Sequence, residues 1–181
     1  MILGAVLAGG LSSRFGSDKA LAEYRGHTLL THAVDALSGW CEHVIVVGRP
    51  TAPAPTLPDW PRAGMGPLGG IAAALHHARD EGYEFVLTCG VDSVALPEDL
   101  PDLLAPAPAF LVSQPIIGLW SWSAIAVIED ILHGDGAHSL KRFTEAIGAR
   151  AVKSPIDPAN INTRADLVAL EGGQEERGHG L

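Results

Sequence analysis

The chain has 181 residues, of which 47% are hydrophobic and 18% are charged, and its formal net charge is −9. This length and apolar content fit one folded domain and exclude a disordered chain. The acidic excess excludes a protein that holds a nucleic-acid backbone, because neutralising many phosphates requires a surface rich in Lys and Arg. Any phosphate is therefore bound locally, with a divalent cation as an additional source of positive charge.

The first apolar run, Ile2–Leu7, has no charged leader and is too short for a signal peptide or a membrane span. We interpret it as a buried strand and expect a cytoplasmic protein without membrane contact. Cys41 and Cys89 show no CxxC or Cys/His spacing, so neither a disulfide framework nor a zinc site is indicated. Cys89 ends an apolar run and is interpreted as a core residue.

Strand-like apolar runs alternate with helical patterns along the chain, which is typical of βαβ units and a mainly parallel sheet. The predicted strands are Ile2–Leu7, Val44–Val47, Phe85–Cys89 and Ala109–Val112. The predicted helices are Leu29–Trp40, Leu68–Ala78, Pro97–Leu104, Ala124–Leu132, Leu140–Ile147 and Arg164–Leu170. Five prolines in Pro50–Pro61 predict a surface loop without regular structure. The predicted fold class is α/β, a single three-layer α/β/α domain over residues 1–170 with a disordered tail at 171–181.

A glycine-rich segment follows the first strand and reads Leu7-Ala8-Gly9-Gly10-Leu11-Ser12-Ser13-Arg14-Phe15-Gly16-Ser17-Asp18-Lys19. It lies at the sheet edge where α/β folds bind ligands. Gly9 and Gly10 let backbone N–H groups approach an anion, while Arg14 and Lys19 add positive charge. The spacing matches neither a P-loop nor a Rossmann dinucleotide motif. The segment predicts a triphosphate site, and a simple strand-to-loop turn is the alternative.

Two further segments carry possible site residues. Asp92 follows the strand Phe85–Cys89 at the same sheet edge. Mg²⁺ prefers one or two carboxylates together with phosphate oxygens and water, so Asp92 is a candidate metal ligand. The alternative is a turn or helix cap. The segment Gly64–Ile71 enters a helix with small residues, which allows close approach to the sheet or to a ligand, or simply close packing.

The glycine-rich segment resembles the signature Leu-Ala-Gly-Gly-x-Ser-Ser-Arg-x-Gly-x-Asp-Lys of the molybdenum cofactor guanylyltransferase (MobA) family of nucleotidyltransferases. The resemblance covers roughly residues 1–170. It implies the Rossmann-like sheet of that superfamily, with GTP as the donor and molybdopterin or molybdenum cofactor as the acceptor. It also implies Mg²⁺ as the metal and cofactor-delivering or molybdoenzyme-maturation proteins as partners. By this resemblance, Arg14, Lys19 and Asp92 are catalytic, Leu7, Ala8, Gly9 and Gly10 bind the nucleotide with Lys19 and Asp92, and Asp92 holds the metal.

Three more segments carry the resemblance. Gly66-Pro67-Leu68-Gly69-Gly70 is similar to the family's second motif. Asp59 lies where the family places a carboxylate that accepts hydrogen bonds from guanine N1 and N2, although it could be an ordinary turn residue. Asn160-Ile161-Asn162-Thr163 looks like the start of the family's Asn-x-Asn-Thr-Pro motif, which puts Asn160 and Asn162 on the acceptor and metal side. The alternative there is helix capping by Thr163 and Asp166.

The stretch Gln114–Trp120 resembles a family segment that lines the acceptor site, or it is an apolar strand with Trp120 in the core. Other positions depart from the family. Val94 and Ala95 replace a Pro and an aromatic residue after the metal-binding Asp, Arg164 replaces the motif's Pro, and Arg49 follows the second strand where a base-reading Asn is common.

The sequence thus predicts an enzyme that transfers GMP from GTP to the phosphate of molybdopterin and releases pyrophosphate. A cytidylyltransferase, or a nucleotidyltransferase with another acceptor, remains an alternative. A nucleotide-binding module that has lost catalysis is the alternative from another class, motivated by Val94 and Ala95.

Overall fold

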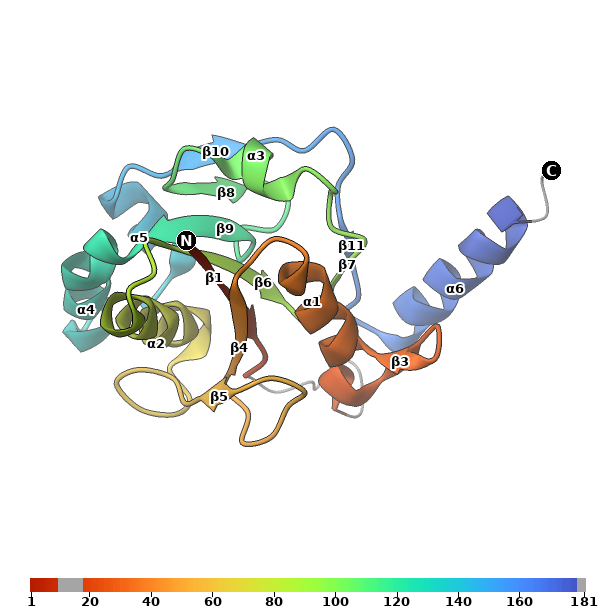
Figure 1. The fold of residues 1–181 in the computed structure, drawn as a ribbon, viewed down its shortest axis with the longest axis horizontal. Coiled ribbons are helices and arrows are strands. Elements are labelled where there is room, and N and C mark those ends of the chain that lie inside the picture. The colour runs from red at the N-terminus through yellow and green to blue at the C-terminus, as the bar shows by residue number, and fades with distance from the viewer. Residues whose placement is uncertain (10–17, 179–181) are drawn as a thin grey trace.

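A computed structural model describes residues 1–9 and 18–178 of the chain. Its centre is a seven-stranded sheet in the order β10-β8-β9-β6-β1-β4-β5 (Figure 1). The strands are β1 (Ile2–Leu7), β4 (His43–Val47), β5 (Thr56–Leu57), β6 (Phe85–Gly90), β8 (Ala109–Leu111), β9 (Gly118–Ser121) and β10 (Arg150–Val152). Strand β9 runs antiparallel to β6 and β8, and the other neighbours pair in parallel. The predicted α/β class with a mainly parallel sheet is confirmed.

Three central strands end at the same level of the sheet. Leu7 at the end of β1 pairs with Val47 of β4 and with Gly90 of β6. The residues that follow these strands, 8–9, 48–49 and 91–92, therefore emerge together at the carboxyl edge. In open α/β sheets this edge is the usual place for ligands.

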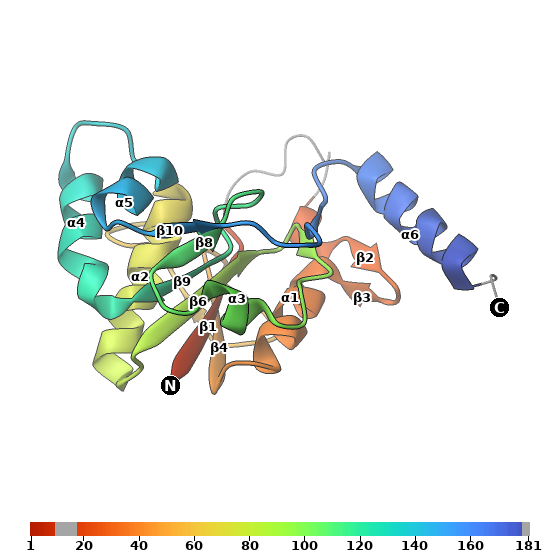
Figure 2. The same cartoon turned by 90° about the horizontal axis from the view of Figure 1, so that it is seen from above.

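Helices cover both faces of the sheet (Figure 1 and Figure 2). They are α1 (Leu29–Ser38), α2 (Gly66–Glu81), α3 (Leu100–Leu104), α4 (Ile125–His133) and α5 (Leu140–Ala146). Buried residues of α1 and α3 form one hydrophobic core with the sheet, and those of α2, α4 and α5 form a second core on the other face. Cys89 is fully buried in the first of these cores, as predicted, and burial raises the pKa of its thiol.

Local sequence signals explain where these helices begin and end. Thr28 precedes α1 and its side chain accepts a hydrogen bond from the N–H of Thr31. Helix α2 has Pro67 in its first turn and ends at Gly82, whose φ of 83° is in the left-handed region that favours glycine. Ser139 caps α5 in the same way as Thr28 caps α1.

Several short elements differ from the prediction. Strands β2 (Glu23–Tyr24) and β3 (His27–Thr28) form a hairpin, and strands β7 (Ser93–Val94) and β11 (Ala159–Asn160) pair antiparallel. The prediction included neither pair, because two-residue strands leave no periodic pattern to recognise. It was also wrong to exclude regular structure from Pro50–Pro61, where β5 adds a short edge strand beside β4.

The last helix, α6 (Arg164–Gly178), projects from the body of the molecule (Figure 1 and Figure 2). The prediction ended this helix at Leu170, and the structure continues it to Gly178. Leu167 packs in a small core with Tyr24, Leu29 and Val94, which attaches the start of α6 to the hairpin and to β7. Within the described part of the chain, no helix is long and apolar enough to cross a membrane.

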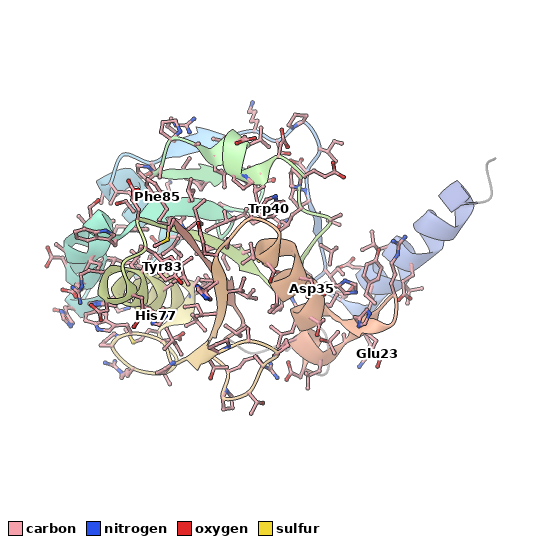
Figure 3. The ribbon with its side chains drawn as sticks, viewed as in Figure 1. Glu23, Asp35, Trp40, His77, Tyr83 and Phe85 are labelled. Atoms are coloured by element: carbon pink, nitrogen blue, oxygen red, sulfur yellow. The ribbon has the colours of Figure 1, made fainter. Side chains whose placement is uncertain are left out.

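At the opposite, amino-terminal edge of the sheet, Tyr83 is a buried residue. Figure 3 labels Tyr83 and Phe85 where the chain enters β6. The hydroxyl of Tyr83 and the ring Nδ1 of His43 form a hydrogen bond there. The three cavities of the candidate site lie toward the carboxyl edge.

Candidate active site

A cavity of about 160 Å³ lies at the carboxyl edge of β1 and β6. Its lining includes Leu7, Ala8, Gly9, Lys19 and Asp92, which the sequence predicted to act together. The ammonium Nζ of Lys19 lies 3.7 Å from the carboxylate Oδ2 of Asp92. Two other predicted phosphate-binding residues, Gly10 and Arg14, lie outside the described residues. The roles of all these side chains remain predictions.

The loop that carries Asp92 is held by neighbouring segments. β7 begins one residue after Asp92 and pairs with β11, and the N–H of Ile161 donates a hydrogen bond of 3.1 Å to the Asp92 carbonyl. The backbone of Asp92 is therefore held in place, while its side chain is 29% exposed and can reach a ligand. Gly90 leaves room for it, because a Cβ at position 90 would lie 2.6 Å from Asp92 Oδ1.

Asp18 and Arg49 form a bidentate ion pair that the sequence analysis did not predict. Arg49 donates from its two terminal nitrogens to the two carboxylate oxygens of Asp18, over 2.9 and 2.7 Å. This hydrogen bonding lowers the pKa of Asp18 and raises that of Arg49. Asp18 also accepts from the N–H of Ala20, at the start of the 3₁₀ turn Lys19–Leu21. The pair thus connects the end of β4 to the residue before Lys19, a contact across 31 positions that no sequence motif encodes.

A second cavity, of about 630 Å³, lies beyond β1 toward β4 and β5. Its lining includes Gly9, Gly48, Arg49, Asp59 and Gly70. The backbone N–H groups of Met65 and Gly64 act to lower the pKa of the Asp59 carboxyl. Burial is nevertheless the larger effect and raises the pKa of Asp59. The structure therefore places Asp59 in the wall of a cavity, and its role toward guanine stays a prediction.

Backbone segments approach unusually closely at this cavity. Gly48 has a φ of 95°, and a Cβ there would lie 2.7 Å from both Cα and N of Gly9. Gly70 of α2 faces β1 in a similar way, because its Cβ would lie 3.0 Å from Cδ2 of Leu7. The small residues of the second glycine-rich segment thus allow α2 to pack closely against β1, and Gly70 also lines the cavity.

A third cavity, of about 670 Å³, lies on the other side of Asp92 toward β8 and α5. Its lining includes Asp92, Gln114, Ile116, Lys141 and Glu145. Asp92 also lines the small cavity, and Ile116 lines all three. The three cavities therefore adjoin one another along one cleft, and the small cavity with the Lys19–Asp92 pair shares residues with each of the two larger ones.

The stretch from Gln114 to Trp120 combines cavity-lining residues with a core residue. Gln114 and Ile116 line the third cavity, whereas Trp120 lies in β9 and is fully buried. The indole N–H of Trp120 donates a hydrogen bond of 2.9 Å to Thr88 Oγ1, whose hydroxyl donates to the carbonyl of Ile116. Trp120 is thus a core residue that supports the cavity wall from behind.

The segment that contains Asn160 and Asn162 lies beside Asp92. Asn160 pairs through its backbone with Ser93 in the β7–β11 ladder. The N–H groups of Asn162 and Thr163 both donate to Asp166 Oδ2 over 2.9 Å, and Thr163 Oγ1 accepts from the N–H of Asp166. This is a capping box, and its hydrogen bonds lower the pKa of Asp166. The capping interpretation of Thr163 and Asp166 is confirmed.

Comparison with known proteins identifies the family. The MobA-like NTP transferase domain matches residues 4–152. The chain belongs to the MobA-like NTP transferase family. The molybdenum cofactor guanylyltransferase of Acidiphilium cryptum is 38% identical, over 93% of each chain, and the probable molybdenum cofactor guanylyltransferase of Deinococcus radiodurans is 43% identical, over 95% of each. The crystal structure of molybdopterin-guanine dinucleotide biosynthesis protein A from Archaeoglobus fulgidus superposes with a TM-score of 0.76 at 20% identity, and covers 96% of this chain and 99% of that chain.

The predicted nucleotidyltransferase fold is thereby confirmed, and the cleft is that of a MobA-like domain. Among the described residues, no group of three or more His, Cys, Asp or Glu is arranged to hold a metal ion. Two carboxylates among the described residues line the small cavity, and Asp18 is paired with Arg49, which leaves Asp92 as the candidate metal ligand. That donor set is the kind with which Mg²⁺ combines phosphate oxygens and water.

Proposed function

We propose that this chain transfers GMP from GTP to the phosphate of molybdopterin in a magnesium-dependent reaction that releases pyrophosphate. Relatives that match it over more than nine-tenths of its length are named molybdenum cofactor guanylyltransferases, which supports the substrates. The structural observation that carries the proposal is the arrangement of the three cavities around the Lys19–Asp92 pair. Lys19 and Asp92 lie 3.7 Å apart between two cavities of similar size, an arrangement suited to two substrates that react at their meeting point.

The cavity toward β4 and β5 is the proposed donor site. Its walls combine apolar side chains such as Leu7, Val47 and Ile116 with few polar groups, as is usual for sites that bind a flat ring. The carboxylate of Asp59 can accept from guanine N1–H and the N2 amino group together, a donor pair that cytosine does not offer. Backbone N–H groups at Gly9 and Gly10, with Arg14 and Lys19, would hold the phosphates.

Asp92 is the proposed Mg²⁺ ligand, and bound Mg²⁺ would neutralise charge on the phosphates during transfer. The third cavity is the proposed acceptor site, with Asn160 and Asn162 on the same side as Asp92. Proteins that deliver the cofactor or mature molybdoenzymes are the partners this function calls for, and a cytoplasmic location belongs to the same proposal.

In the proposed reaction, an oxygen of the acceptor phosphate attacks the α-phosphorus of GTP in line. The new P–O bond forms as the bond between the α-phosphorus and the bridging oxygen to the β-phosphate breaks, and pyrophosphate leaves with that oxygen. A phosphate nucleophile is already ionised near neutral pH, so the reaction needs no general base. The protein's contribution is alignment of the two substrates and neutralisation of charge by Lys19 and Arg14.

The test is to incubate the protein with Mg²⁺, molybdopterin cofactor and either GTP or CTP, and to measure pyrophosphate. We expect release with GTP that depends on the acceptor. Release with CTP but not with GTP would identify a cytidylyltransferase. GTP binding without pyrophosphate release with any acceptor would identify a non-catalytic module.

Two variants test the roles at the centre of the cleft. Lys19→Ala and Asp92→Ala should each lower turnover at least about a hundredfold, because each removes a charge aimed at the reacting phosphates. Thermal unfolding should show that both variants remain folded. The matched control is Lys153→Ala, an exposed lysine that follows β10 and lies outside the lining of the three cavities. Full activity of either variant would refute the assigned role.

A further inference from the structure

Helix α5 presents a carboxylate and an ammonium to the third cavity. Lys141 and Glu145 are four residues apart, which places them on one face of the helix, and both line the cavity. Both residues are exposed. Among the described residues, neither side-chain charge has a hydrogen bond or an ion pair. These two groups are therefore available to a ligand in the cavity.

We propose that Glu145 recognises the pterin ring of the acceptor and that Lys141 assists it. This inference rests on the proposed function and adds the residues that select the second substrate. A pterin carries a 2-amino-4-oxopyrimidine ring, whose edge presents an amino group, a ring N–H and a carbonyl in that order. A carboxylate accepts from the first two groups at once, and an ammonium beside it donates to the carbonyl.

The same edge occurs on guanine, which makes the two large cavities chemically parallel. Asp59 is the proposed reader of guanine in the cavity of 630 Å³, and Glu145 would be the corresponding reader in the cavity of 670 Å³. The third cavity also has apolar walls for the faces of a flat ring, from Phe110, Ile116 and Leu140. Its size and chemistry thus fit a second bicyclic heterocycle.

Two other polar residues of this cavity, Gln114 and Thr144, are already engaged within the protein. Gln114 is 7% exposed, its Oε1 accepts from Ser93 Oγ over 2.7 Å, and its Nε2 donates to the Pro158 carbonyl over 2.8 Å. The hydroxyl of Thr144, a buried residue, donates to the Lys141 carbonyl. These bonds hold the cavity wall in place, and the remaining polar side chains of the lining are those of Ser113, Asp92 and the two charged residues of α5.

Asp92 lines the same cavity as Glu145. An acceptor whose ring lies against α5 can therefore extend its phosphate toward the Lys19–Asp92 pair, where the donor's phosphates would be held. Recognition of the ring and presentation of the nucleophile belong to one cavity.

The binding test uses two fluorescent probes, unsubstituted pterin and lumazine, and lumazine differs from pterin in having an oxygen in place of the 2-amino group. The wild-type protein should bind the pterin at least about tenfold more tightly than lumazine, because lumazine leaves one lone pair of the carboxylate without a donor. Glu145→Gln should weaken pterin binding at least about tenfold and remove most of this preference. Wild-type affinity and preference in the variant would overturn the proposal, as would a wild-type protein that binds both probes equally.

The matched control is Glu84→Gln, the same chemical change at an exposed glutamate just before β6, at the opposite edge of the sheet. It should leave both affinities unchanged. Lys141→Ala should weaken pterin binding severalfold, and Lys141→Arg should restore much of it because the positive charge and its donors return.

Kinetics separate this inference from the proposed function. Glu145→Gln should raise the KM for the molybdopterin acceptor about tenfold while leaving the KM for GTP unchanged. If the wild type releases pyrophosphate but the variant's acceptor KM does not change, the role of Glu145 is refuted and the function stands. If pterin binding depends on Glu145 but no nucleotide yields pyrophosphate, the function is refuted and pterin recognition stands.

Discussion

Replacing Gly48 with alanine tests whether the close approach of two backbone segments holds the donor site together. Gly48 follows β4 with a φ of 95°, a region that costs an L-residue about 1–2 kcal/mol. The new Cβ would also lie 2.7 Å from Cα and N of Gly9, closer than two such atoms can pack. Because the contact is with backbone, no side-chain rotation relieves it, and overpacking of this kind costs about 1–3 kcal/mol. We therefore expect Gly48→Ala to lower the free energy of unfolding by at least about 2 kcal/mol.

Gly82→Ala provides the matched control for Gly48→Ala. Gly82 has a similar φ of 83°, but a Cβ there meets nothing within 4 Å. Its loss should be about 1–2 kcal/mol from the backbone conformation alone. Urea unfolding would measure both variants, and a thermal midpoint lowered by about 4–8 °C is the expected size for Gly48→Ala in a domain of this length. Gly48→Ala should also weaken GTP binding, because Gly9 must shift, whereas Gly82→Ala should not. An equal loss of stability in the two variants would show that the predicted contact with Gly9 is absent.

The other predictions concern three side chains. In the proposed function, guanine recognition requires ionised Asp59, and burial raises the pKa of this carboxyl. The KM for GTP should therefore rise as the pH falls through that raised pKa. Asp59→Asn should remove this dependence, and an unchanged pH profile in the variant would contradict the assignment. Arg49→Ala removes the bidentate pair with Asp18 and should raise the KM for GTP severalfold, while the loss of stability stays below about 1 kcal/mol because the pair is partly exposed; a wild-type KM would show that the pair does not position the donor site. Thr163→Ala removes the N-cap of α6 and should lower the free energy of unfolding, measured in urea, by about 1 kcal/mol. Thr163→Ser keeps the capping hydroxyl and should retain most of that stability.

Much of the fold follows from periodic patterns that the sequence displays directly. The central strands are continuous apolar runs because both faces of a parallel sheet are covered, and α1 repeats Leu30, Ala33 and Leu37 at helical spacing. The order of these elements is enough to predict an α/β sheet with its ligand edge after β1 and β6. The short pairs were missed for the opposite reason, since β7 and β11 lie far apart in the chain and each contributes only two residues.

In the candidate site, too, some features were predicted from local patterns and others were missed. Gly9, Lys19 and Asp92 were predicted to lie together because each follows or approaches the carboxyl end of a central strand, and the structure places them around one cavity. The Asp18–Arg49 pair was not predicted, because opposite charges 31 residues apart meet only when β4 lies beside β1. The sequence also did not suggest Glu145, since a glutamate on a short helix has no local signal that separates it from a solvated residue.

The sequence by itself therefore determined the fold class, the family and the edge of the sheet where chemistry is expected. These features depend on local periodicity and on motifs whose residues are adjacent in the chain. Only the tertiary structure decided that three cavities adjoin along one cleft, that Gly48 must be a glycine because Gly9 lies against it, and that α5 lines the third cavity with two charged side chains. Those features depend on contacts between segments far apart in the chain, and such contacts exist only after the sheet has brought the segments together.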